Sequence, residues 1–177
     1  MSDRIRKRTK YLTVSSMLSA LGVILLALGA MVDVLDITTA VLASMLCIYA
    51  VIEMGGAYPW LIWLVTSVLG LLLLPVKTPA LFYALFAGFY PILKEHLEKI
   101  RRPISDVLKL AVFHVCLFGI YLALKLFFPS VLSLDDSWWL IAGTYALCIV
   151  AFVVYDIALT RLISFYLFRL RNRFRIR

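Results

Sequence analysis

Apolar runs long enough to cross a lipid bilayer fill most of this chain, and this property restricts the possible folds more than any other. Hydrophobic residues make up 64% of the 177 positions. A helix needs about 20 apolar residues to span the hydrocarbon core, where the helix must satisfy its own backbone hydrogen bonds. We therefore predict an all-α polytopic membrane protein, a six-transmembrane-helix bundle that forms a single transmembrane domain over residues 1–177. The expected helices cover residues 11–32, 37–53, 58–74, 80–97, 106–128 and 138–168, and a basic tail covers 169–177.

Proline and glycine mark the expected ends of these helices. Gly55-Gly56 follows an apolar run, and paired glycines there are a strong signal for the end of a helix. Pro103 lies in the one strongly polar interval between the two ends of the chain, residues 94–109. Proline disfavours helix in the residue before it and fits the first turn of a new helix, so we expect one helix to end and another to begin here. Pro91 is expected to kink or end the fourth helix.

The distribution of positive charge predicts the orientation in the membrane. Of the 18 lysines and arginines, Lys77 and Lys125 fall on one expected side and the other sixteen on the opposite side. Positive loops stay in the cytoplasm, so both termini and the interval 94–109 are expected to be cytoplasmic. The net charge of +8 is explained in the same way, and we expect no nucleic-acid binding.

Catalytic and metal-binding patterns are not found in the sequence. It contains no HExxH, GxSxG or glycine-rich phosphate loop, so we expect neither an enzyme nor a cofactor. Three cysteines, Cys47, Cys116 and Cys148, lie inside apolar runs without CxxC spacing. Such thiols usually behave as small hydrophobic side chains, and no metal site is expected.

Two ionisable residues fall at similar depth within the predicted spans. His114 lies about two turns into the fifth helix, and Asp156 lies a turn and a half before Arg161 in the sixth. Burying either side chain in lipid without a partner costs free energy, and a hydrogen bond between the imidazole and the carboxylate would give both side chains a partner. We interpret them as a buried polar pair that holds the two helices together, with a proton relay as the alternative.

Other polar and aromatic residues gather toward the expected outer face. Aromatic walls with a few polar groups suit a small organic ligand. Lys125 would supply positive charge there, or would extend outward to nearby aspartates, and the tryptophans also fit an interfacial belt. The candidate substrate-binding residues are Lys125, Tyr83, Trp138, Tyr145 and Asp33.

Small residues recur at helical spacing in the first predicted helix. Ser15, Ser19, Gly22 and Gly29 lie along one stripe of residues 11–32. Small side chains allow two helix backbones to approach closely in lipid. The stripe therefore packs against neighbouring helices of the same bundle or docks a partner protein in the membrane.

Six helices in fewer than 200 residues, together with residues 46–75 (LCIYAVIEMGGAYPWLIWLVTSVLGLLLLP) and 84–94 (ALFAGFYPILK), resemble the substrate-binding S component of energy-coupling factor transporters. The resemblance implies that the first helix docks a coupling subunit, here through Ser15, Ser16, Ser19 and Ala20. It also implies a ligand near the outer face, under the loop that joins helices 1 and 2.

The function expected from this resemblance is uptake of a small molecule such as a vitamin or other micronutrient. The chain would bind the molecule in the cell membrane, and a coupling transmembrane subunit with ATPases would supply the energy, because the sequence has no nucleotide-binding motif. The alternative is a non-transporting scaffold, similar to the small six-helix membrane subunit of the bacterial cell-elongation machinery. Either protein would also contact membrane lipids.

Overall fold

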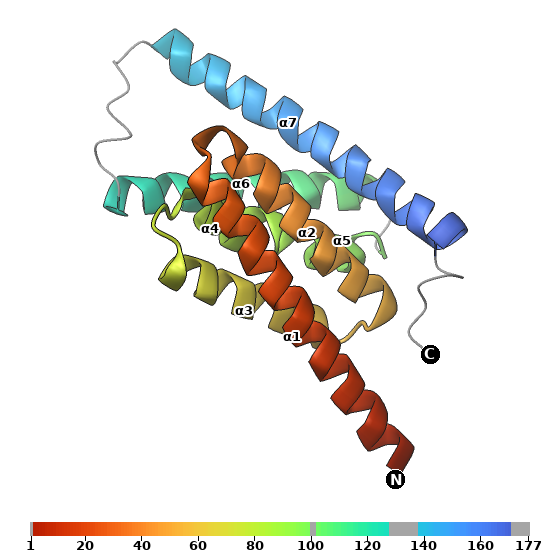
Figure 1. The fold of residues 1–177 in the computed structure, drawn as a ribbon. Coiled ribbons are helices and arrows are strands. Elements are labelled where there is room, and N and C mark those ends of the chain that lie inside the picture. The colour runs from red at the N-terminus through yellow and green to blue at the C-terminus, as the bar shows by residue number, and fades with distance from the viewer. Residues whose placement is uncertain (1, 100–101, 128–137, 171–177) are drawn as a thin grey trace. The chain divides into compact units, whose positions relative to one another are not determined.

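The computed structural model describes residues 2–99, 102–127 and 138–170, and these residues contain seven α-helices (Figure 1). The helices are α1 (Ser2–Met31), α2 (Asp36–Glu53), α3 (Tyr58–Leu73), α4 (Thr78–Phe82), α5 (Tyr90–Leu97), α6 (Arg102–Phe127) and α7 (Trp138–Phe165). A 3₁₀ turn, Asp33–Leu35, joins α1 to α2. Two π-helical turns also occur, Tyr83–Ala87 between α4 and α5 and Tyr166–Leu170 after α7.

The chain divides by its internal contacts into two units, Met1–Cys116 and Leu117–Arg177, with the boundary inside α6. The first unit holds α1 to α5 and the first half of α6. The second unit holds the rest of α6, together with α7. The single transmembrane domain stays a prediction.

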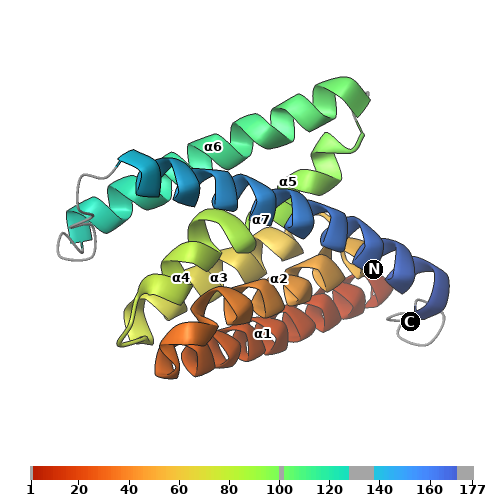
Figure 2. The ribbon, with the colours of Figure 1, turned by 90° about the horizontal axis from the view of Figure 1, so that it is seen from above.

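In the first unit α1 lies alongside α2 and α3, and glycines bring the helices close together (Figure 2). A Cβ atom added at Gly22 of α1 would lie 3.0 Å from Thr66 Cγ2 of α3. One added at Gly29 would lie 2.0 Å from Thr39 Oγ1 of α2. The close approach matters because, in lipid, helices are held together by packing and polar contacts rather than by exclusion of water. The small-residue stripe of α1 thus packs against helices of its own unit.

The turn between α2 and α3 requires glycine at both of its central positions. Gly55 and Gly56 have φ angles of 60° and 61°, in the left-handed region. Residues with a Cβ atom are strained in this region, whereas glycine adopts it freely. The backbone N–H groups of Met54 and Gly55 both donate to the Ala50 carbonyl, which closes the end of α2. The paired-glycine signal in the sequence therefore marks a real helix end.

Residues 80–97, expected as one helix, form two helices separated by the π turn. The break lies before Pro91, because α5 begins at Tyr90 and carries the proline in its first turn. Proline is tolerated there because the first N–H groups of a helix have no intrahelical acceptor. The expected kink therefore lies about one turn earlier than the sequence indicated.

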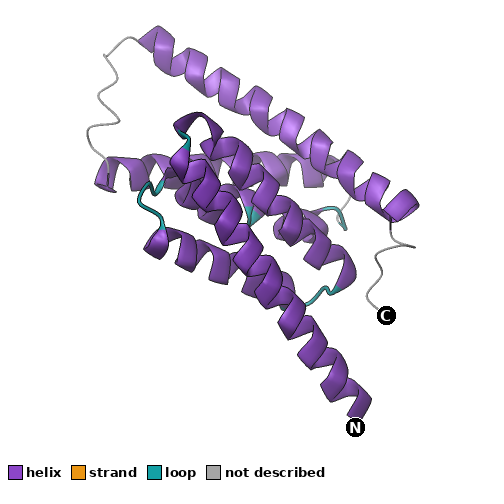
Figure 3. Ribbon diagram, viewed as in Figure 1, coloured by secondary structure: helices purple, strands orange, loops and turns teal. Residues whose placement is uncertain are grey.

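The all-α class is confirmed for the described residues, in which no strand occurs (Figure 3). Four helical segments in this part of the chain are long and apolar enough to cross a membrane, and α3 is apolar but shorter. The chain is therefore a helical membrane protein. The four segments are Ile5–Met31, Asp36–Glu53, Ile104–Ala123 and Ile141–Phe168.

Candidate functional site

The π turn Tyr83–Ala87 is buried in the core of the first unit. Tyr83 is 1% exposed and Ala87 is completely buried. The Tyr83 side chain shares a hydrogen bond with Cys47 of α2, whose Sγ also contacts the Pro59 carbonyl at 3.6 Å. The Gly88 N–H donates to the Tyr83 carbonyl five residues back, at 2.8 Å. This wider turn places an aromatic hydroxyl between helices, and π turns of this kind occur frequently at functional sites.

Trp63 of α3 fixes the π turn from the side. Its indole Nε1 donates a hydrogen bond to the Ala84 carbonyl at 3.0 Å. A Cβ atom added at Gly88 would lie 2.6 Å from Tyr83 Cζ and 2.8 Å from Trp63 Cδ1, so only glycine fits between the two rings. Phe89 adds a third ring, with its centroid 5.9 Å from that of Trp63. The turn is thus held by one polar contact and by close aromatic packing.

Buried hydroxyl groups lie on α3 close in sequence to Trp63. Thr66 is completely buried, and its Oγ1 lies 3.5 Å from the Ser19 carbonyl of α1. Ser67 is 6% exposed, and its Oγ has no hydrogen-bond partner among the described residues. Ser67 lies one helical turn after Trp63, so the two side chains share a side of α3. The buried side of α3 therefore carries hydroxyl groups as well as aromatic rings.

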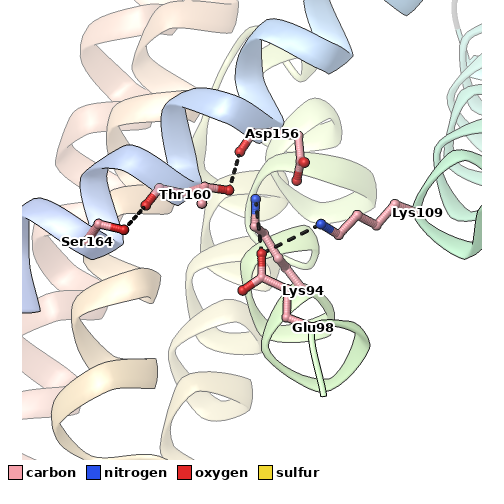
Figure 4. Close-up of polar contacts among 6 residues, drawn as sticks. All are labelled: Lys94, Glu98, Lys109, Asp156, Thr160 and Ser164. Carbon is pink, nitrogen blue, oxygen red and sulfur yellow. Dashed lines mark hydrogen bonds and ion pairs between the residues drawn. The ribbon is translucent and has the colours of Figure 1, made fainter. Parts of the chain in front are cut away.

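A second polar cluster joins α5 to α6 (Figure 4). Glu98 Oε1 lies 3.6 Å from Lys94 Nζ and 3.6 Å from Lys109 Nζ. The Lys94 side chain is 1% exposed and that of Lys109 is 10% exposed, whereas Glu98 is 41% exposed. Burying an ammonium group is costly unless an opposite charge accompanies it, and Glu98 supplies that charge to both lysines. One carboxylate therefore links the two helices on either side of residues 100–101.

From the sequence, Lys94 and Lys109 were assigned to a polar interval that determines the orientation of the chain in the membrane. Their burial was not predicted. The available signal was the four-residue spacing of Lys94 and Glu98, which puts both side chains on one face of a helix. Sequence spacing cannot show which side of α5 faces the rest of the protein, because this depends on how α5 packs against the other helices.

Hydroxyl groups also form a ladder along α7 of the second unit (Figure 4). Thr160 Oγ1 donates to the Asp156 carbonyl at 3.0 Å, and Ser164 Oγ donates to the Thr160 carbonyl at 2.9 Å. Such bonds to the carbonyl four residues back satisfy a hydroxyl group within its own helix. His114 of the first unit does the same with Nδ1, which lies 2.8 Å from the Leu110 carbonyl. The predicted His114–Asp156 pair joins residues of the two units and stays a prediction.

The predicted substrate-binding residues are distributed over both units. Tyr83 lies in the first unit and forms part of the π turn. Lys125 lies near the end of α6 and is exposed, and Trp138 and Tyr145 are exposed residues of α7. Asp33 opens the 3₁₀ turn after α1, and its side chain lies outside the described part of the structure. Tyr83 contacts Cys47 in the core of the first unit, and the pocket stays a prediction.

The predicted docking residues of α1 fall on two sides of the helix. Ser15 and Ser19 are buried, and Ser15 Oγ lies 3.9 Å from Met54 Sδ. Ser16 and Ala20 are exposed. One pair therefore packs inside the first unit and the other remains at its surface, and docking to a partner stays a prediction. The arginine tail beyond Leu170 and the loop 128–137 lie outside the described residues.

No group of three or more histidine, cysteine, aspartate or glutamate side chains comes together as possible metal ligands in the described ranges. Comparisons with protein-family models, with curated proteins and with solved structures find no match. Any assignment of function therefore depends on the chain itself.

Proposed function

We propose that the chain is the substrate-binding subunit of an uptake system in the cell membrane. It would bind a small molecule of vitamin or micronutrient size, and separate coupling and ATPase subunits would supply energy. The observation that carries this proposal is the break between α4 and α5 at the buried π turn. Interrupted helices in membrane transporters expose backbone groups at the substrate site, and irregular backbone is tolerated in a membrane only where protein or a cavity surrounds it.

The side chains around the π turn support a binding role. Tyr83 and Trp63 offer aromatic faces, and their polar atoms already bond to Cys47 and to the Ala84 carbonyl. Ser67 offers a buried hydroxyl group without a hydrogen-bond partner in the described residues. A mainly apolar lining with a few placed polar groups is typical of sites for small organic molecules. The π turn is also a natural place for α5 to move relative to α4, because its hydrogen bonding is already irregular.

The proposed orientation has both termini in the cytoplasm. The sixteen cations on one expected side, against two on the other, support it. On α1, Ser16 and Ala20 offer a small-residue surface to a coupling subunit, since their helix already packs internally through Ser15 and Ser19. No catalytic step is required of this chain.

The first test is mass spectrometry of the protein purified gently from its own membrane. A bound metabolite, or a coupling subunit with ATPases, is the expected result. Envelope-assembly proteins without any small molecule would instead support the scaffold function. An isolated protein that binds no candidate metabolite in subsequent screening would contradict the proposal.

Two substitutions then separate binding from coupling. Trp63→Phe removes the hydrogen bond to the Ala84 carbonyl, and we expect weaker binding of the identified ligand. Ser16→Leu adds bulk to the exposed face of α1, and we expect uptake to be lost while binding is kept. Met17→Leu, at an adjacent exposed position, is the matched control and should preserve both.

A further inference from the structure

The first turns of α1 extend beyond the length that the hydrocarbon core requires. The helix runs without a break from Ser2 to Met31. The segment from Tyr11 to Met31 alone measures about 30 Å at 1.5 Å per residue, which matches the thickness of the core. Tyr11 packs edge-on against Tyr58, with ring centroids 5.4 Å apart, and tyrosine is typical of the membrane–water interface. Tyr11 therefore marks one boundary of the core.

Three consecutive exposed cations, Arg6, Lys7 and Arg8, lie just outside this boundary, and Lys10, also exposed, lies next to Tyr11. The three consecutive cations are three to five residues before Tyr11, so their backbone lies about 4–8 Å beyond the core. The headgroup layer on each side of a bilayer is about 5–7 Å thick. The three charges thus fall at the depth of lipid phosphates. A helix turns by about 100° per residue, so the charges also spread over more than half of its circumference.

Exposed cations held close together on one helix repel one another, and an anion beside them offsets this repulsion. A phosphate group at the same depth would supply that negative charge. The depth of the charges also selects the partner, because an acidic protein surface would have to enter the headgroup layer to reach them.

We propose that Arg6, Lys7 and Arg8 form a cationic collar that binds the phosphate groups of anionic phospholipids. The collar is rigid, since it continues the transmembrane helix, and it can contact lipids on several sides at once. Attraction to an anionic membrane surface amounts to about a fivefold change in affinity for each cation. This inference depends on membrane insertion of α1 and not on the proposed transport function.

The test is native mass spectrometry of the full-length protein in detergent, titrated with equimolar phosphatidylglycerol and phosphatidylcholine. In a micelle the readout does not depend on which way the protein was inserted in the cell. We expect the wild-type protein to retain phosphatidylglycerol preferentially, and this preference should weaken as salt is raised. In the triple variant Arg6→Gln, Lys7→Gln, Arg8→Gln the preference should fall at least tenfold.

The matched control is the variant Arg6→Lys, Lys7→Arg, Arg8→Lys, which keeps all three charges and should retain the wild-type preference. Equal thermal midpoints in lipid-free detergent would show that both variants are folded. The proposal is overturned if the wild-type protein shows no preference. It is also overturned if the glutamine variant keeps the preference, or if that variant loses a co-purifying acidic protein while its lipid binding is unchanged.

Discussion

The contact between Gly29 and Thr39 shows how one residue sets the distance between two helices. Thr39 is 6% exposed, and its Oγ1 lies 3.0 Å from the Leu35 carbonyl and 3.1 Å from that of Asp36. The hydroxyl group is therefore fixed within α2, at the point where a Cβ atom on residue 29 would be placed. α1 can approach only because residue 29 has no side chain.

We expect Gly29→Ala to destabilise the protein by about 1–3 kcal/mol, the usual cost of adding a methyl group to a filled core. Thermal unfolding in detergent would measure the change. Gly119→Ala on α6 is the control, because nothing lies within 4 Å of its added Cβ, and it should be neutral or slightly stabilising. The double variant Gly29→Ala, Thr39→Ala should recover part of the loss. Equal effects of Gly29→Ala and Gly119→Ala would contradict the contact.

The Glu98 cluster gives a second prediction about single residues. We expect a double-mutant cycle with Glu98→Gln and Lys109→Met to give a coupling energy of about 1 kcal/mol, modest because Glu98 is 41% exposed. The cycle isolates this pair from other contacts of either residue. Glu95→Gln removes a more exposed pair with Lys99, at 3.1 Å, and should change stability by less than about 0.5 kcal/mol. A coupling energy near zero would show that Glu98 does not link α5 to α6.

At the scale of elements, the π turn depends on α3 as well as on its own sequence. Trp63→Phe keeps an aromatic ring but removes the donor to the Ala84 carbonyl, so we expect a loss of about 1 kcal/mol. Hydrogen exchange should become faster at Gly88, whose N–H closes the π turn. Trp60→Phe is the control, because Trp60 contacts Phe89 through its ring, with centroids 5.8 Å apart. If the exchange rate at Gly88 does not change in Trp63→Phe, the indole does not hold the turn.

Most element boundaries could be predicted from the sequence, because they depend on local signals. Long apolar runs located α1, α2, α6 and α7, and Gly55-Gly56 located the turn before α3. The π turn could not be predicted, since α4 and α5 read as one apolar run and the distortion is stabilised from α3 by Trp63. For the same reason, the sequence did not predict that Lys94 is buried, or that Ser15 is buried while Ser16 is exposed. Each depends on which side of a helix another helix covers.

For the whole molecule, the distribution of charge predicts a single orientation that labelling can test. We expect Thr78→Cys, at an exposed position between α3 and the π turn, to react with a membrane-impermeant maleimide added outside intact cells. Lys99→Cys should react with the maleimide only after the cells are permeabilised. An antibody should likewise bind an epitope fused after Arg177 only in permeabilised cells. Both single-cysteine variants need Cys47, Cys116 and Cys148 replaced by alanine. The reason for the expected pattern is that fewer cations must cross the membrane when sixteen of them remain inside.

Leu72→Cys is the control for this experiment, because it is exposed in α3 but lies within an apolar segment, where a charged reagent cannot reach it. If Lys99→Cys is labelled from outside, the predicted orientation is wrong. The proposed coupling to ATPase subunits would then be contradicted as well, since ATPases act from the cytoplasm. If both loop cysteines react on the same side, the chain between residues 78 and 99 does not cross the membrane from one side to the other. In that case the helix interrupted at the π turn would enter and leave the membrane on one face. Orientation and the role of the π turn are therefore decided by the same pair of cysteines.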